Sequence, residues 1–195
     1  MRYMQIRPTD VANGPGVRVT LFVSGCRLHC EGCFNKEAWD FKAGYEFTQE
    51  TINRILDYMN KPFITGLTLL GGDTLEPANQ KDTVNLLRQV REKFGNTKDI
   101  WTWTGRTWKE LQKENYNKYK IDKDPDYKNY SYVPEITEEF LSLIDVLVDG
   151  PFVQRLNRKG LVYSGSINQK IIDVPKSLEQ GKLVLSKYDY LENRT

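Results

Sequence analysis

The sequence predicts a single α/β domain, residues 1–195, whose mainly parallel sheet forms an open, partial barrel. Short apolar runs alternate along the chain with segments of helical periodicity. Strands and helices that alternate in this way are joined by right-handed crossovers into parallel sheets. The alternating units are too few to close an eightfold barrel. A chain of 195 residues is long enough to bury a core without disulfides or metal staples.

The first predicted elements are a strand, a helix and a second strand. Residues 17–23 are rich in β-branched and aromatic side chains and predict a strand that leads into a cysteine-rich loop. Thr48 is a candidate N-cap for a helix whose apolar residues recur at helical spacing as far as Met59. Residues 66–70 predict a buried strand, which the two glycines at 71–72 end.

The later part of the chain continues the alternation. A second helix carries apolar residues between positions 84 and 94, and Gly95 closes it. The remaining predicted elements are a strand at 100–104, a short helical segment at 107–113, a helix around 138–143, and strands at 145–148, 171–174 and 183–185.

Residues 112–134 interrupt this pattern. They are dense in Lys, Asp, Asn and Tyr and contain almost no aliphatic side chains, so they cannot bury much surface. A stretch of this length is either functional or a solvated loop, and its five tyrosines leave a partner surface open as an alternative. We expect an exposed insertion here.

The overall composition argues against several classes of partner and site. With 28 basic and 26 acidic residues the net charge is +2, too small to predict binding to nucleic acid or to anionic lipid. No apolar stretch approaches the roughly 20 residues of a membrane span, and the N-terminal residues lack the apolar core of a signal peptide. The cysteines form no disulfide framework, which favours a cytoplasmic location. With a single histidine, His29, we predict no acid–base catalytic residue.

The three cysteines of the chain, Cys26, Cys30 and Cys33, lie within eight residues in a C-x3-C-x2-C spacing. Three thiolates this close suit three corners of a 4Fe-4S cluster, which normally takes four cysteines. A cluster with only three protein ligands leaves one iron open to bind another molecule. We therefore predict that these cysteines are metal ligands of one cluster that takes part in chemistry.

Two other interpretations of these cysteines stay open. Zinc would take the three thiolates together with His29 as a Cys3His set, although four ligands within eight residues would strain a tetrahedral site. The third possibility is three unrelated thiols that pack as small hydrophobic side chains.

A second candidate motif, Gly71-Gly72-Asp73, follows the predicted strand at 66–70. Ligands of parallel α/β sheets bind at the carboxyl ends of the strands. Glycine lets the backbone approach a ligand closely, and Asp73 offers a carboxylate for an ammonium group. Alone the motif is a common turn, so its functional interpretation depends on the cysteine loop one crossover upstream.

Both motifs resemble those of the radical S-adenosylmethionine (SAM) superfamily, and the chain is similar to one family within it, the activating proteins of anaerobic ribonucleoside-triphosphate reductase. The similar blocks are 13–18, 21–26, 32–36, 71–73, 99–105, 145–152 and 165–169. They span most of the chain in the same order, which makes the resemblance specific. Thr74 departs from the family, which usually has a proline there, and we expect it to loosen the turn after Asp73.

The resemblance implies a fold, a mechanism and partners. The fold would be the partial (β/α) barrel of the radical SAM type. An electron passed to the cluster would cleave SAM to methionine and a 5′-deoxyadenosyl radical, which would take a hydrogen from a glycine Cα of the reductase and leave a glycyl radical. A flavodoxin- or ferredoxin-type protein would supply the electron. The implied SAM contacts are Gly32, Cys33, Phe34, Gly71, Gly72 and Asp73.

Alternative functions and simpler roles remain. A different radical SAM activase or a nucleoside-modifying enzyme would use the same cysteines, and the latter would need a closed pocket for a small molecule. A cluster-bearing electron carrier would need a fourth protein ligand, and the chain offers no fourth cysteine. Within the similar blocks, Arg18 is interpretable as a surface strand residue, and Trp101 and Trp103 as core packing.

Overall fold

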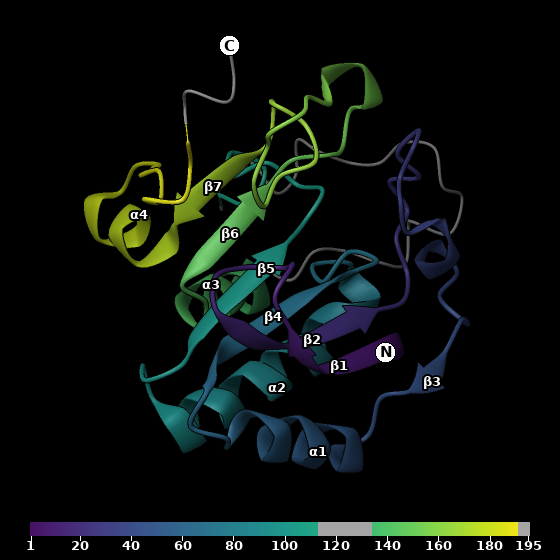
Figure 1. Cartoon of the computed structure of the whole chain (residues 1–195), viewed down its shortest axis with the longest axis vertical. Coiled ribbons are helices and arrows are strands. Elements are labelled where there is room, and N and C mark those ends of the chain that lie inside the picture. The colour runs from purple at the N-terminus through teal and green to yellow at the C-terminus, as the bar shows by residue number, and fades with distance from the viewer. Residues whose placement is uncertain (113–133, 191–195) are drawn as a thin grey trace.

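The computed structural model describes residues 1–112 and 134–190, which form one open, seven-stranded sheet in the order β3-β1-β2-β4-β5-β6-β7 (Figure 1). The strands are β1 (Arg2–Asp10), β2 (Val17–Val23), β3 (Tyr45–Glu46), β4 (Ile64–Gly71), β5 (Asp99–Trp103), β6 (Val146–Asp149) and β7 (Lys170–Asp173). The open α/β sheet is as predicted. Its pairing is mixed rather than mainly parallel. The four strands β2, β4, β5 and β6 are parallel, whereas β1 and β3 on one side and β7 on the other pair antiparallel.

Three helices cover one face of this sheet (Figure 1). They are α1 (Gln49–Met59), α2 (Pro77–Phe94) and α3 (Pro134–Ser142), while α4 (Val174–Gln180) follows β7 at the edge. Both predicted caps are confirmed: Thr48 accepts from the Thr51 N–H at the start of α1, and the Gly95 N–H donates to the Arg91 carbonyl at the end of α2. Within the described ranges no helix is long and apolar enough to cross a membrane.

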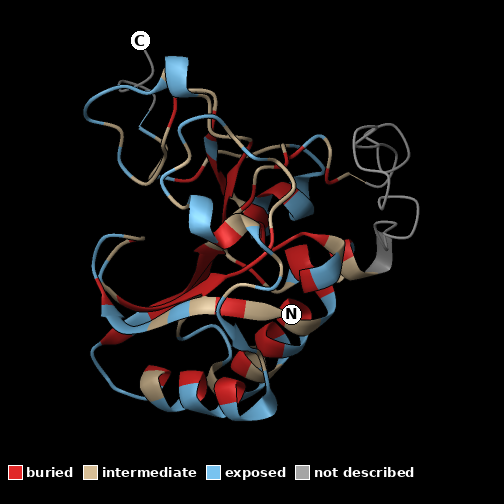
Figure 2. Cartoon of the chain, turned by 90° about the vertical axis from the view of Figure 1, so that its right-hand side faces the viewer, coloured by how far each residue is buried: buried red, intermediate tan, exposed pale blue. Residues whose placement is uncertain are grey.

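Alternate side chains of the central strands enter two different apolar clusters, as the period of two in a strand requires. On the helix face, Leu21, Leu69 and Leu147 join the large core beneath α1, α2 and α3. On the second face, Trp101 and Val148 belong to a smaller cluster packed with tyrosines from the C-terminal loops. Figure 2 shows that burial is concentrated in the central strands and on the helix sides that face them.

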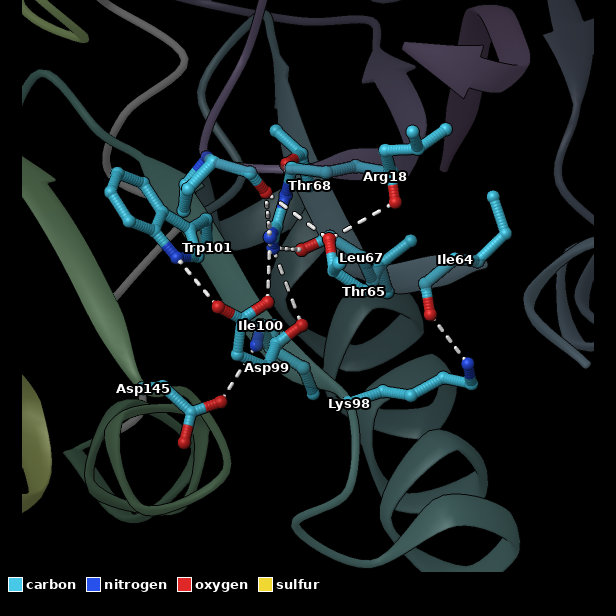
Figure 3. Close-up of polar contacts among 12 residues, drawn as sticks. Arg18, Ile64, Thr65, Leu67, Thr68, Lys98, Asp99, Ile100, Trp101 and Asp145 are labelled. Atoms are coloured by element: carbon cyan, nitrogen blue, oxygen red, sulfur yellow. Dashed lines mark hydrogen bonds and ion pairs between the residues drawn. The ribbon is translucent and has the colours of Figure 1, made fainter. Parts of the chain in front are cut away.

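Arg18 of β2 is fully buried on the second face and is not a surface strand residue. Its guanidinium donates to the Thr68 hydroxyl at 2.7 Å and to the Leu67 carbonyl at 2.9 Å. It also donates to the Asp99 carboxylate at 2.6 Å (Figure 3) and to the Pro15 carbonyl at 3.2 Å. A charged side chain in a strand predicts exposure, but this one is buried because these oxygens satisfy it.

Trp101 and Trp103, the two tryptophans of β5, differ in burial. Trp101 is fully buried, and its ring centroid lies 5.6 Å from the Arg18 guanidinium carbon. Core packing is therefore confirmed for Trp101. Trp103 is only half-buried, and its indole N–H donates to the Tyr163 carbonyl at 3.0 Å.

Several elements depart from the sequence prediction. β1 and the edge strand β3 are polar strands that the apolar pattern did not indicate. They form because they pair with their neighbours. Residues 107–112 form turns rather than a helical segment. The predicted strand at 183–185 is reduced to one isolated bridge between Leu185 and Ile172. Nearly all of the predicted insertion at 112–134 lies outside the described residues.

Candidate functional site

The cysteine loop follows β2 directly and lies at the carboxyl ends of the parallel strands. Its start is fixed by backbone hydrogen bonds, from the Gly25 N–H to the Ala38 carbonyl at 2.7 Å and from the Cys26 N–H to the Trp39 carbonyl at 3.2 Å. Gly25 has a φ of +94°, a backbone conformation that favours glycine. The loop therefore leaves the strand in a defined direction.

The Gly71-Gly72-Asp73 motif ends β4 directly beside the cysteine loop. The Gly72 N–H donates to the Val23 carbonyl at 2.7 Å, and the Asp73 N–H donates to the Gly25 carbonyl at 2.9 Å. A Cβ on Gly72 would lie 2.4 Å from the Gly25 carbonyl oxygen, and Gly71 has a φ of +113°. The close approach is therefore made by Gly25 of the cysteine loop at Gly72 and by Val23 at the end of β2 at Gly71.

All the predicted site residues line one cavity of about 470 Å³. They are Cys26, Cys30, Gly32, Cys33, Phe34, Gly71, Gly72 and Asp73. The side chain of Phe34 is 84% exposed, so it lies at the rim. The structure thus brings the cysteine loop and the strand-end motif together at the edge of the sheet where the parallel strands end.

The remaining walls come from residues to which the sequence assigned no site role. Several belong to the blocks that carried the resemblance, namely Asn13, Trp103, Thr104, Gly105, Gly150, Phe152, Gly165 and Gln169. The rule that ligands bind at strand ends could have indicated those after β5 and β6. Asn157 and Tyr163 also line the cavity, and no motif or periodicity in the sequence marked them.

The carboxylate of Asp73 is buried and already holds protein donors. The Thr104 hydroxyl donates to it at 2.8 Å, the Leu75 N–H at 2.9 Å and the Gly105 N–H at 3.3 Å. A carboxylate offers about four acceptor positions, so one position remains for a ligand. Of the three occupied positions, those bonded to Thr104 and Gly105 tie the end of β5 to the end of β4, and the one bonded to Leu75 closes the turn after Asp73.

The turn after Asp73 is tied down rather than loosened. The side chain of Thr74 is fully buried, and its hydroxyl lies 2.9 Å from the Thr102 hydroxyl of β5. The threonine at the position of the family's proline therefore adds a side-chain link between this turn and β5.

The surroundings of Cys26 and Cys30 disfavour a free thiolate at these two positions. Burial raises the pKa of the Cys26 thiol, and the carboxylates of Asp73 and Glu76 raise it further. Burial also raises the pKa of Cys30. A thiolate at these positions needs a positively charged partner such as iron, because metal binding replaces the proton.

His29 does not join the cysteines. Its ring stacks on Trp39 with centroids 4.5 Å apart, and it lines a second hollow that shares no residue with the cavity. Among the described residues, no three His, Cys, Asp or Glu side chains are grouped for a single metal ion. Zinc–sulfur distances of ~2.3 Å would bring the sulfurs within about 4 Å of one another. The donor set fits a cluster, in which each thiolate binds its own iron, and does not fit Cys3His zinc.

Comparison with known proteins indicates an iron–sulfur cluster. Residues 12–172 match the family described as 4Fe-4S single cluster domain. The chain is 39% identical over 171 residues to the anaerobic ribonucleoside-triphosphate reductase-activating protein of Enterobacteria phage T4, covering 88% of this chain and 93% of the relative. Proteins of the same name from Salmonella typhimurium and Escherichia coli are 39% and 38% identical over 173 residues, covering 88% of this chain and 97% of each relative. The chain therefore belongs to the anaerobic ribonucleoside-triphosphate reductase-activating proteins and carries their 4Fe-4S single cluster domain.

Proposed function

We propose that this chain binds one 4Fe-4S cluster through Cys26, Cys30 and Cys33 and binds SAM in the adjoining cavity. In this role it activates anaerobic ribonucleoside-triphosphate reductase by generating a glycyl radical on it. The observation that carries the proposal is that the cysteine loop and the strand-end motif 71–73, which are far apart in the chain, line the same cavity. The open sheet then corresponds to the partial barrel of radical SAM enzymes.

The three cysteines supply thiolates for three irons and leave the fourth iron without a protein ligand. Their side chains are half-buried, so solvent reaches them only in part. When bound, the cluster supplies the electron that cleaves SAM reductively to methionine and a 5′-deoxyadenosyl radical. The protein positions the reactants and excludes water.

The cavity has the size and the walls that a SAM molecule needs. Its volume of about 470 Å³ lies within the usual range for small-molecule sites. The remaining acceptor position of Asp73 suits the ammonium of the methionine moiety, with Gly71 and Gly72 beside it. Trp103 and Phe152 provide apolar wall for the adenosine. Gly32, Cys33 and Phe34 border the same space from the cysteine loop.

The reductase enters the proposal as a protein substrate. The relatives are named as activators of that enzyme, and the reacting glycine has to come within near-contact distance of the radical. A flexible segment of the partner would therefore enter past the rim, where Phe34 is exposed. We propose a flavodoxin- or ferredoxin-type electron donor on the basis of the family resemblance.

Anaerobic reconstitution with iron and sulfide tests the proposal in two steps. Metal and sulfide analysis should give about four irons and four sulfides per chain, and dithionite should then drive SAM cleavage. Stoichiometric zinc without sulfide would overturn the cluster, and a cluster without SAM cleavage would favour an electron carrier. Electron paramagnetic resonance after mixing with the cognate reductase should show a glycyl doublet. SAM cleavage without that doublet would overturn the choice of substrate.

A further inference from the structure

A buried ion pair lies beside the first cysteine of the loop. Glu76 directly precedes α2 and is 1% exposed. Its carboxylate accepts from the guanidinium of Arg27 at 2.6 Å and from the backbone N–H of Arg27 at 2.9 Å. Arg27 immediately follows Cys26 in the chain. One carboxylate therefore holds both the main chain and the side chain of the residue next to a predicted cluster ligand.

The pair is held in place by packing on both sides. The Arg27 guanidinium lies 4.4 Å from the centroid of the Phe41 ring, and its side chain is 12% exposed. The Glu76 N–H donates to the Asp73 carbonyl at 3.2 Å, which ties this position to the strand-end motif. The buried carboxylates of Asp73 and Glu76 and the guanidinium of Arg27 thus lie around the start of the cysteine loop.

The Glu76 carboxylate is not used to cap its own helix. Glu76 is the N-cap residue of α2, yet its side chain makes no capping hydrogen bond to the first turn. Caps of this kind are the usual reason for an acidic residue at a helix start. The carboxylate is instead turned toward Arg27, so its role lies in the cysteine loop.

We propose that Glu76 and Arg27 are positioning residues that hold the Cys26 end of the loop and set the reduction potential of the cluster. Of the proposed function, this inference requires only that the chain binds the 4Fe-4S cluster; it does not depend on SAM cleavage. Charges act strongly where water is excluded, and the potential of an iron–sulfur cluster depends on the charge and hydrogen bonding around it. The Glu76 carboxylate disfavours the added electron and lowers the potential, whereas the Arg27 guanidinium raises it.

Because the two charges have opposite signs, removing them should shift the reduction potential in opposite directions. A merely structural role would not produce such opposite shifts. In reconstituted protein, Glu76→Gln should shift the midpoint potential in the positive direction and Arg27→Gln in the negative direction. Each shift should be on the order of tenfold in the reduction equilibrium, which is about 59 mV for one electron. The double variant should return close to the wild-type value. Single variants that shift in the same direction, or not at all, would overturn the assignment of the potential.

Arg91→Gln provides the matched control. Arg91 forms a similar ion pair with Asp145 at 2.7 Å, but Asp145 precedes β6 at the opposite end of the strands. This change should leave the potential where it is in the wild type. A shift as large as that of Arg27→Gln would show that the effect is not local to the cysteine loop and would contradict the proposal.

The positioning role has its own readout. Glu76→Gln keeps an oxygen that accepts from the Arg27 N–H, whereas Glu76→Ala removes it. Under an iron chelator, Glu76→Ala should lose its cluster several-fold faster than Glu76→Gln, at a temperature where circular dichroism shows both folded. Equal rates would overturn the positioning role. The potentials could shift as expected in protein that does not cleave SAM. That result would support the roles of Glu76 and Arg27 and would contradict only the proposed function.

Discussion

The two ends of the parallel strands are built by different means. At the amino end, charged side chains satisfy one another: Arg18 bonds to Thr68 and Asp99, and Arg91 bonds to Asp145. At the carboxyl end, the cysteine loop and the strand-end motif are joined through the backbone, by the N–H groups of Gly72 and Asp73 and the carbonyls before the cysteines, with the Glu76–Arg27 ion pair beside them.

This difference separates stability from function within one sheet. Hydrogen-bonded ion pairs, of which Arg18 is fully buried, fix the amino end, and these side chains already bond to one another rather than to a ligand. At the carboxyl end, glycines and loops leave a cavity lined by thiols and strand ends, where parallel α/β sheets bind their ligands. Mutations at the amino end should therefore change stability, and mutations at the carboxyl end should change cluster and SAM binding.

The largest effect is expected from Cys33→Ala at the carboxyl end. Two remaining thiolates hold a cubane cluster poorly, so iron content and SAM cleavage should both be lost. The side chain is only half-buried, so the midpoint of urea unfolding of the iron-free chain should stay within experimental error of the wild type. A variant that keeps a full cluster would contradict the ligand assignment.

Arg18→Met at the amino end should reverse this pattern. It leaves the Leu67 carbonyl, the Thr68 hydroxyl and Asp99 without their buried donor, which should lower the free energy of unfolding by about 2–4 kcal/mol. Urea unfolding measures this loss. Folded protein should still take up a full cluster.

Arg88→Met is the control for Arg18→Met, because it breaks an ion pair with Glu139 on the exposed surface, where such pairs contribute little. It should leave the urea midpoint nearly unchanged. If Arg88→Met destabilised the chain as much as Arg18→Met, burial of the network would not be the cause.

Gly72→Ala addresses the contact between the two motifs. The new Cβ would lie 2.4 Å from the Gly25 carbonyl oxygen, so either the cysteine loop or the end of β4 has to move. We expect cluster content to fall several-fold together with SAM binding. Gly95→Ala, where nothing lies within 4 Å of the added Cβ, should keep the cluster. A Gly72→Ala protein that lost only SAM binding would mean that the glycine serves the ligand directly.

The spacing of apolar residues along the sequence was enough to predict the helices and strands that bury an apolar face. The spacing of apolar residues before Met59 gave α1, and the β-branched run at 17–23 gave β2. The sequence pattern did not predict β1, because its residues are mostly polar and the strand is stabilised by pairing with β2. The burial of Arg18 was missed because its partner Asp99 is 81 residues away in the chain.

The candidate site was predictable to the extent that motifs encode it. Cys26 and Asp73 could be proposed from the sequence because cluster chemistry and strand ends restrict which residues serve there, and both line the cavity. Tyr163 could not, because it reaches the cavity through an irregular loop. The ion pair of Glu76 with Arg27 joins residues 49 positions apart, and only the approach of α2 to the cysteine loop reveals it.

The smallest effect concerns Asp10, at the start of the 11–16 loop that connects the two regions. Burial alone would raise the pKa of Asp10, but hydrogen bonds from Asn13 and the Ala12 N–H hold it below its ordinary value. Asn13 and Ala12 also line the cavity. A carboxyl whose pKa is lowered by folding stabilises the fold above its unfolded pKa of about 3.9, and this contribution is lost as the pH falls through the lower folded value.

Asp10→Asn should therefore flatten the pH dependence of stability on the acid side. In the wild type, the urea midpoint should rise with pH up to about pH 5, because the folded chain loses the Asp10 proton at a lower pH than the unfolded chain does. The variant cannot ionise at this position, so its curve should be shallower over that interval and parallel to the wild type at higher pH. The introduced amide keeps one oxygen that can accept from the Ala12 N–H or the Asn13 amide, so SAM binding near neutral pH should weaken by no more than a few-fold. Parallel curves across the whole range would show that the hydrogen bonds to Asp10 do not tie the loop to the fold.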